Sequence, residues 1–175
     1  MALRRGCRIE IAAGIVAVAT FVLLCGTHAA SAQEDTLKPI PAVECQKFAS
    51  RLQDSVGIPM KAEEDDFSDI NTREDGRSCH ITGSASNKNF ANPDEVMALM
   101  AKPFGDWKED PERADSGPGG ADKGFLGENR LAVLDVSWEP APGVTCSDKE
   151  PLSECKVTPQ QRLWTAIIDI VQKVK

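Results

Sequence analysis

Two apolar segments decide the fold: LAVLDVSW at residues 131–138 and RLWTAIIDIV at residues 162–171. The second is rich in β-branched and aromatic residues, which favour strands. Its flank is also compatible with a helix, because residues 158–161 read TPQQ and apolar residues recur at helical spacing from Leu163 to Val174. Each segment carries one aspartate after two aliphatic residues. This similarity favours two neighbouring strands in one sheet.

The first thirty-two residues have the three-part pattern of a cleavable secretory signal peptide. Three arginines precede an apolar run over residues 9–26, and Ala30-Ser31-Ala32 supplies the small residues that a signal peptidase recognises. The alternative is a retained membrane anchor, but Glu10 shortens the uninterrupted apolar run. We therefore predict a periplasmic or secreted protein that begins at Gln33, with no membrane span in the mature chain.

The mature chain is predicted to be acidic. The whole chain has 20 Lys and Arg and 27 Asp and Glu, and the signal peptide removes three basic residues and one acidic residue. The remaining 17 basic and 26 acidic residues give a formal charge of −9. A surface of this sign disfavours nucleic acid and anionic membranes as partners. Solubility explains the charge more simply than a cationic partner does.

Four cysteines remain after removal of the signal peptide, and an exported chain is expected to oxidise them. We predict the disulfides Cys45–Cys79 and Cys146–Cys155, because each pair closes a local loop between neighbouring elements. The alternative, a metal site that uses these thiols with His80, lacks the CxxC spacing that such sites need. We therefore predict no metal site.

The rest of the chain predicts two helices and several connecting segments. Apolar spacing predicts a helix over 41–56, and Asn92-Pro93 starts a second one that ends near residue 102. Clustered carboxylates at 61–76 predict a solvated acidic connector. Residues 77–83 predict a short strand, and Gly and Pro at 106–127 predict a mobile surface loop that is long enough to bind a ligand.

These elements predict one α+β domain over residues 33–175, stapled by disulfides and including a disulfide loop at 146–155. We expect a small antiparallel sheet of about four strands, with two helices packed on one face.

No motif in the sequence fixes a reaction or a cofactor: GxSxG, HExxH, CxxCH and GxGxxG are all absent, and we predict no catalytic residues. Trp107 and Trp138 are the candidate ligand-binding residues, since both are placed near strand ends and the Gly-rich segment. The alternative is that they fill the ends of the core.

The sequence therefore favours an exported non-catalytic binding or accessory protein of the bacterial periplasm or cell envelope, with an envelope protein, a peptide or a glycan as partner. The alternatives are a small periplasmic hydrolase that uses carboxylates, or an inhibitor of an envelope-directed enzyme. Carboxylates buried in a cleft would indicate the hydrolase, whereas a groove lined by Trp107 and Trp138 would indicate binding.

Overall fold

The computed structural model describes residues 36–146 and 155–174. The signal peptide predicted over residues 1–32 and the interior of the predicted loop at 146–155 lie outside these residues. The chain divides into two units, 1–33 and 34–175, and every element below belongs to the second. Within the described residues, no helix is both long and apolar enough to cross a membrane.

In the described residues, the second unit contains two α-helices, two short 3₁₀ helices and seven strands. In chain order they are β1 (Leu37–Pro39), α1 (Ala42–Val56), β2 (Lys61–Asp69), β3 (Glu74–Ala85), α2 (Pro93–Met100), η1 (Lys102–Phe104), β4 (Lys108–Ser116), β5 (Gly120–Leu126), β6 (Arg130–Pro140), η3 (Pro159–Gln161) and β7 (Arg162–Lys173).

The seven strands form one mixed sheet in the order β2-β3-β1-β7-β6-β5-β4. The short strand β1 runs parallel to β3, and all other neighbouring strands pair antiparallel. The α+β class and the two helices agree with the prediction. The expected antiparallel sheet of about four strands is wrong, because the sheet has seven strands and is mixed.

The two segments that decide the fold are the paired central strands β6 and β7, so the strand interpretation of residues 162–171 is confirmed. Their register runs from Arg130 opposite Gln172 to Pro140 opposite Arg162. Side chains alternate between the two faces of the sheet, as strand geometry requires. One face of β6 and β7 is fully buried, and its members are Ala132, Leu134, Val136, Trp138, Trp164, Ala166, Ile168 and Ile170.

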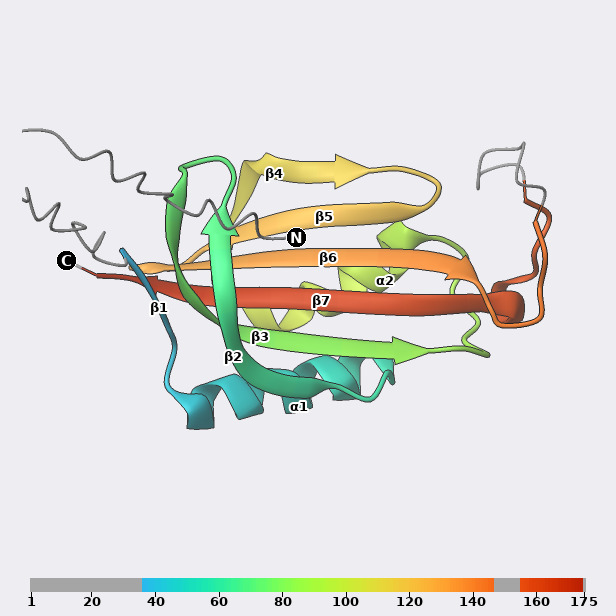
Figure 1. Cartoon of the computed structure of the whole chain (residues 1–175), viewed down its shortest axis with the longest axis horizontal. Helices are drawn as coiled ribbons and strands as arrows, with labels where there is room; N and C mark the ends of the chain where they lie inside the picture. The colour runs from blue at the N-terminus through green and yellow to red at the C-terminus, as the bar shows by residue number, and fades with distance from the viewer. Residues whose placement is uncertain (1–35, 147–154, 175) are drawn as a thin grey trace, which may run out of the picture. The chain divides into compact units, whose positions relative to one another are not determined.

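Both helices pack on that buried face, and Figure 1 shows them behind the sheet. The helix predicted at 41–56 is confirmed as α1, which ends at Gly57 in the left-handed conformation with φ 63°. The predicted cap of the second helix is also present, since the side chain of Asn92 accepts a hydrogen bond of 2.9 Å from the backbone N–H of Glu95.

Both predicted disulfides are present. Cys45–Cys79 joins α1 to β3 across a Cα–Cα distance of 5.7 Å. Cys146–Cys155 joins the two ends of the segment between β6 and η3, with a Cα–Cα distance of 5.5 Å. The first disulfide therefore fixes the helical layer to the sheet.

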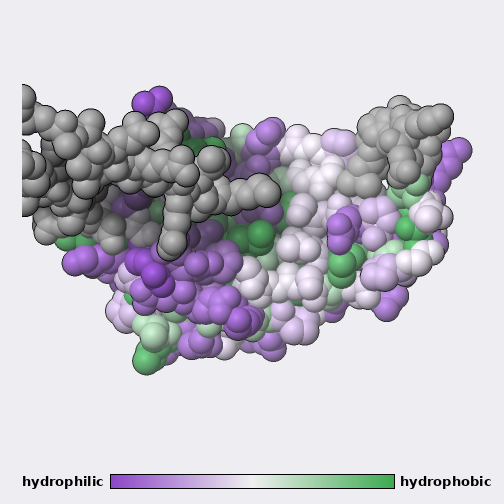
Figure 2. Space-filling model, in the orientation of Figure 1, coloured by the Kyte–Doolittle hydropathy of each residue, from purple (hydrophilic) through white to green (hydrophobic). Residues whose placement is uncertain are grey.

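The acidic connector predicted at 61–76 is wrong, because these residues form β2 and the first part of β3. Nine residue pairs, from Lys61 opposite Thr82 to Asp69 opposite Glu74, hold this hairpin together. Strand β2 lies at the edge of the sheet, where charged side chains can reach water and discourage pairing with another chain. Figure 2 shows strongly hydrophilic side chains gathered over this hairpin.

The mobile loop predicted at 106–127 is also wrong, because it contains the hairpin of β4 and β5. Pro111 is tolerated because β4 is the other edge strand, where a missing backbone donor breaks no ladder. The pairing of β4 with β5 is interrupted by a bulge between Asp110 and Asp115. Only the turn at 117–119 uses the glycine and proline as the sequence suggested.

We call the face of the sheet opposite the helices the open face. Beyond the part of β3 that pairs with β7, the β2–β3 hairpin bends away from the plane of the sheet toward this open face. Strand β1 inserts between β3 and β7, and a side chain at Gly76 would collide with the backbone carbonyl of Leu37. The end of β2 crosses in front of β7 and β6 (Figure 1). Phe67 packs there against a second small core made of Leu37, Leu131 and Val171.

Candidate functional site

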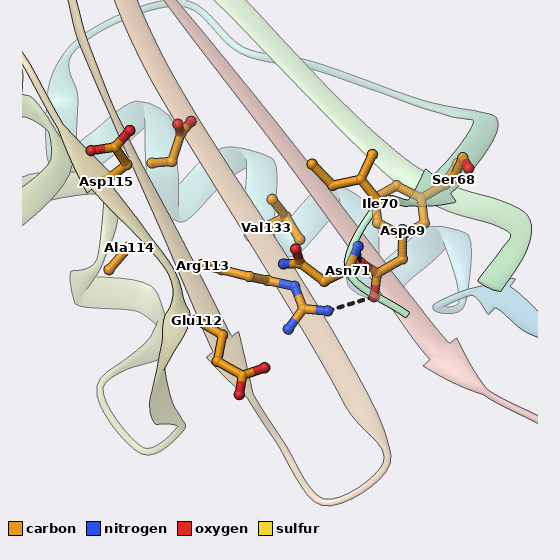
Figure 3. A pocket seen from close by; sticks show the side chains of 11 residues that line it. Ser68, Asp69, Ile70, Asn71, Glu112, Arg113, Ala114, Asp115 and Val133 are labelled. Atoms are coloured by element: carbon orange, nitrogen blue, oxygen red, sulfur yellow. Dashed lines mark hydrogen bonds and ion pairs between the residues drawn. The ribbon is translucent and has the colours of Figure 1, made fainter. Parts of the chain in front are cut away.

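A cavity of about 380 Å³ lies on the open face, between the tip of the β2–β3 hairpin and strands β4 to β6. Figure 3 shows the hairpin residues at one side and Asp115 at the other. The apolar part of its lining comes from Phe67, Ile70, Ala114 and Val133. Ile70 is 88% exposed at the rim. The cavity therefore exists because the hairpin tip lies over the sheet.

Arg113 forms the wall of the cavity on the β4 side. It projects from the bulge of β4 and crosses β5 at Gly124, where an added Cβ would lie 2.8 Å from the Cβ of Arg113. Its guanidinium donates to Asp69 on β2 at 2.5 Å and to Asp110 on β4. In Figure 3 the Arg113 side chain extends past Val133 toward Asp69. This contact joins the two edge strands of the sheet.

The carboxylate of Asp69 organises the hairpin tip. It accepts hydrogen bonds from the Asn71 backbone N–H at 3.0 Å and from the Thr72 hydroxyl at 2.9 Å. Burial raises the pKa of Asp69, but the hydrogen bonds from Thr72, Asn71 and Arg113 outweigh this and lower the pKa below its ordinary value. Asp69 is therefore a stable anion that holds both the turn and Arg113.

One carboxyl group of the cavity wall, that of Asp122, has a second carboxyl group beside it. Asp122 on β5 and Asp135 on β6 are direct cross-strand partners, and their side chains are hydrogen-bonded to each other. Burial, followed by the hydrogen bond to Asp122 and the charge of Asp122, raises the pKa of Asp135 to about 6. A hydrogen bond between two carboxyl groups needs a proton on one of them. Asp135 therefore keeps its proton to a higher pH than an ordinary aspartate does.

Farther along β3, Ser78, His80 and Asp169 meet in a different arrangement. The Ser78 hydroxyl donates to Asp169 at 2.6 Å, and His80 Nδ1 lies 2.8 Å from the same carboxylate oxygen. In a catalytic triad the histidine stands between the serine and the acid. Here the acid stands between the other two, and Ser78 is fully buried. This arrangement stabilises the pairing of β3 with β7 and does not form a nucleophile.

A metal centre would need several acidic, histidine or cysteine side chains close together. In the part of the chain that the structure describes, no group of three or more His, Cys, Asp or Glu side chains is placed to hold a metal ion. All four cysteines of the predicted disulfides are oxidised.

The candidate residue Trp107 lies in the core on the helix side of the sheet. Its ring centroid is 5.4 Å from that of Phe104 and 6.2 Å from that of Phe48, both at edge-to-face angles. It follows η1 and is not part of a strand. Packing of this kind supports the alternative role of Trp107 as part of the core.

The candidate residue Trp138 is 5% exposed and lies at the other end of the sheet. Its indole N–H donates to the Pro118 carbonyl at 2.8 Å, and the Arg162 guanidinium carbon lies 4.4 Å from the ring centroid. Trp138 lines a hollow of about 370 Å³ beside the start of α2, and Trp107 is not part of that lining. The two tryptophans therefore do not share this groove.

Sequence reasoning missed the residues that build the cavity on the open face. Arg113 and Asp69 are 44 positions apart, and the assigned connector and loop concealed both of them. One signal was present: Asp135 interrupts an apolar strand, and a carboxyl group at such a position faces the side of the sheet opposite the core.

Searches against known protein families, curated proteins and solved structures find no match.

Proposed function

We propose that this protein is an exported, non-catalytic binding protein whose ligand occupies the cavity on the open face. The observation that supports this proposal is the cavity itself, in which an apolar base meets several carboxylates. Ligand sites are concave, mostly apolar and marked by a few placed polar groups, often with perturbed pKa values. The two disulfides are compatible with export.

The construction of the cavity supports binding more than it supports chemistry. The one guanidinium that lines it is held by two buried carboxylates, Asp69 and Asp110. A side chain that is fixed in this way keeps the cavity open but has little freedom to take part in a reaction. Ile70 stands exposed at the rim, where an apolar group of a ligand can cover it.

Backbone amide shifts measured by NMR test this proposal. The oxidised protein is titrated with a panel of short peptides, oligosaccharides and small fragments that includes cationic, neutral and anionic members. Binding in the cavity predicts saturable shifts at Ile70, Asn71, Ala114 and Val133. The matched control is Val133→Trp, which fills the cavity and should abolish them. Saturable shifts that cluster only at Trp138 and Arg162 would contradict the proposal.

One observation favours a second candidate function, a small hydrolase that uses carboxylates. Acids gather in the cavity wall, whereas Trp107 and Trp138 do not share a groove. Asp135 lies beside the wall residue Asp122, and its pKa of about 6 is suited to a general acid. The same panel, incubated with the protein and analysed by mass spectrometry, separates the two functions. Products that Asp135→Asn no longer forms would establish the hydrolase, whereas binding without products supports the binding protein.

A further inference from the structure

The cavity on the open face has an excess of negative charge. Four acidic residues line it against one basic residue, Arg113. Arg113 is already paired with Asp69 inside the cavity and with Asp110 just outside it. The remaining acidic members of the lining are Glu112, Asp115 and Asp122. Their charge is available to a ligand.

Three carboxyl groups follow one another across neighbouring strands. Asp115 on β4 is the register partner of Asp122 on β5, and Asp122 is the register partner of Asp135 on β6. Cross-strand partners project from the same face at about 5 Å, and like charges placed in this way repel each other. The chain keeps this unfavourable row beside a cavity. A cation in the cavity would relieve the repulsion.

The apolar part of the cavity adds a second requirement. Phe67 and Val133 form its base, and Ile70 extends the apolar surface to the rim. A bare inorganic cation gains nothing from such a base. A Lys or Arg side chain does, because its alkyl stem packs on apolar groups while its charged end reaches polar ones. The cavity volume of about 380 Å³ is ample for a side chain of that length.

Several charged groups surround the carboxyl pair of Asp122 and Asp135. The bulge of β4 contributes Glu112, Arg113 and Asp115, and the hairpin tip contributes Asp69. Asp169 lies on β7 diagonally from Asp135, and its carboxylate is held by Ser78 and His80. Most of these neighbours are acidic, so their negative charge attracts both a proton and a ligand cation to the carboxyl groups of Asp122 and Asp135. Binding of the cation therefore competes with binding of the proton.

We propose that the cavity binds a Lys or Arg side chain carried on an extended segment of a partner protein, with its charged end beside the carboxyl groups of Asp115 and Asp122. The inference rests on the proposed function and specifies the chemistry of its ligand. A polypeptide occupant is favoured because, in the described residues, neither helix covers the open face next to the cavity, where Thr165, Ile167 and Ser137 are half-buried. The full sequence has a formal net charge of −7, and an acidic protein attracts a basic partner at long range.

Isothermal titration calorimetry on the oxidised protein tests the proposal with three blocked tripeptides: acetyl-Leu-Lys-Leu-amide and its Gln and Glu counterparts. At pH 7.5 the Lys peptide should bind at least tenfold more tightly than the Gln peptide. Its affinity should fall several-fold at pH 5. Near pH 6, the heats measured in buffers of different ionisation enthalpy should reveal release of a proton on binding.

Two variants separate a local effect from the general charge of the protein. Asp122→Asn should remove most of the advantage of the Lys peptide. Asp66→Asn removes the same charge from an exposed position on β2 whose side chain is 88% exposed, and it should leave the advantage unchanged. Circular dichroism establishes that each variant is folded.

Each remaining outcome overturns a defined part of the account. Equal affinity for the Lys and Gln peptides, or preference for the Glu peptide, would overturn the inference but leave the cavity as a binding site. Butylamine that binds as tightly as the Lys peptide would overturn the polypeptide occupant. If no member of the wider panel binds in the cavity at either pH, the proposed function fails together with the inference.

Discussion

Replacement of Arg113 by methionine tests whether the ion pairs of Arg113 hold the hairpin over the sheet. Arg113→Met keeps the aliphatic stem but removes the charge, so Asp69 and Asp110 lose their partner. The side chains of these three residues are 10%, 3% and 9% exposed. Removal of one partner from a buried ion pair costs about 3–5 kcal/mol, because a buried charge is left without compensation.

The stability expected for a domain of this size makes the loss easy to measure. Native domains are stable by roughly 5–15 kcal/mol, so a loss of about 3 kcal/mol removes a large part of the total. We take the lower end because Asp69 keeps its hydrogen bonds from Asn71 and Thr72 in the variant. The loss should become smaller as the pH falls, because Arg113 helps to lower the pKa of Asp69, and the stability that comes from this lowered pKa is lost as Asp69 becomes protonated.

Urea denaturation at pH 7 measures this effect, and Arg77→Met is the matched control. Arg77 also bridges two carboxylates, Glu64 and Asp66, each at 3.2 Å, but its side chain is 44% exposed. Exposed ion pairs contribute about 0–1 kcal/mol. If Arg113→Met is no more destabilising than Arg77→Met, the ion pairs of Arg113 do not hold the hairpin and the reasoning is wrong.

Three further substitutions test other parts of the structure by urea denaturation. Asp135→Asn should stabilise the protein by about 1 kcal/mol above pH 6 and give no gain near pH 4. The folded pKa of Asp135, about 6, exceeds the unfolded value of 3.8, so the stability of the unmodified protein falls as the pH rises between these values. The full linkage would be about 3 kcal/mol, but the side chain is only half-buried, which reduces it; equal gains at both pH values would contradict this. Replacing Cys45 and Cys79 by alanine should cost about 4 kcal/mol for a loop with a sequence separation of 34, and a loss below about 1 kcal/mol would show that this disulfide contributes little. Gly124→Ala should cost about 1–3 kcal/mol because its Cβ meets the Cβ and Cδ of Arg113 at 2.8 and 2.9 Å, and a neutral result would show that Arg113 does not cross β5 there.

The centre of the fold was predictable because local preference and tertiary environment agree there. Residues 162–171 are rich in β-branched side chains, and the same side chains fill the core. The helix α1 shows the same agreement, with its apolar stripe and its stop at Gly57. The local spacing of the cysteines likewise predicted both disulfides.

The two edge hairpins were not predictable in the same way because their sequences have low strand preference. Glu63, Asp65 and Pro111 are disfavoured in a central strand but are tolerated at an edge, where side chains reach water and one side of the backbone needs no partner. Whether such a segment becomes a strand therefore depends on the neighbouring strand with which it pairs and not on its own strand preference. The sequence expectation of four strands omitted these edges.

The cavity on the open face was missed for a related reason. It needs the tip of the β2–β3 hairpin to meet β4, so that Asp69 contacts Arg113 across 44 positions of sequence. No local pattern records that contact. The aspartates within the apolar strands were visible, but the partner of Asp135 depends on the register of β5 against β6.

The position of the hairpin tip over the open face is the central claim, and nuclear Overhauser effects measured on a methyl-labelled sample test it most directly. Phe67 lies on β2, and the small core that it packs against lies on β1, β6 and β7. The structure predicts strong effects between the Phe67 ring protons and methyl groups of Leu37, Leu131 or Val171. If the Phe67 ring shows effects to none of these methyl groups, the hairpin does not lie over the sheet, and the cavity does not exist.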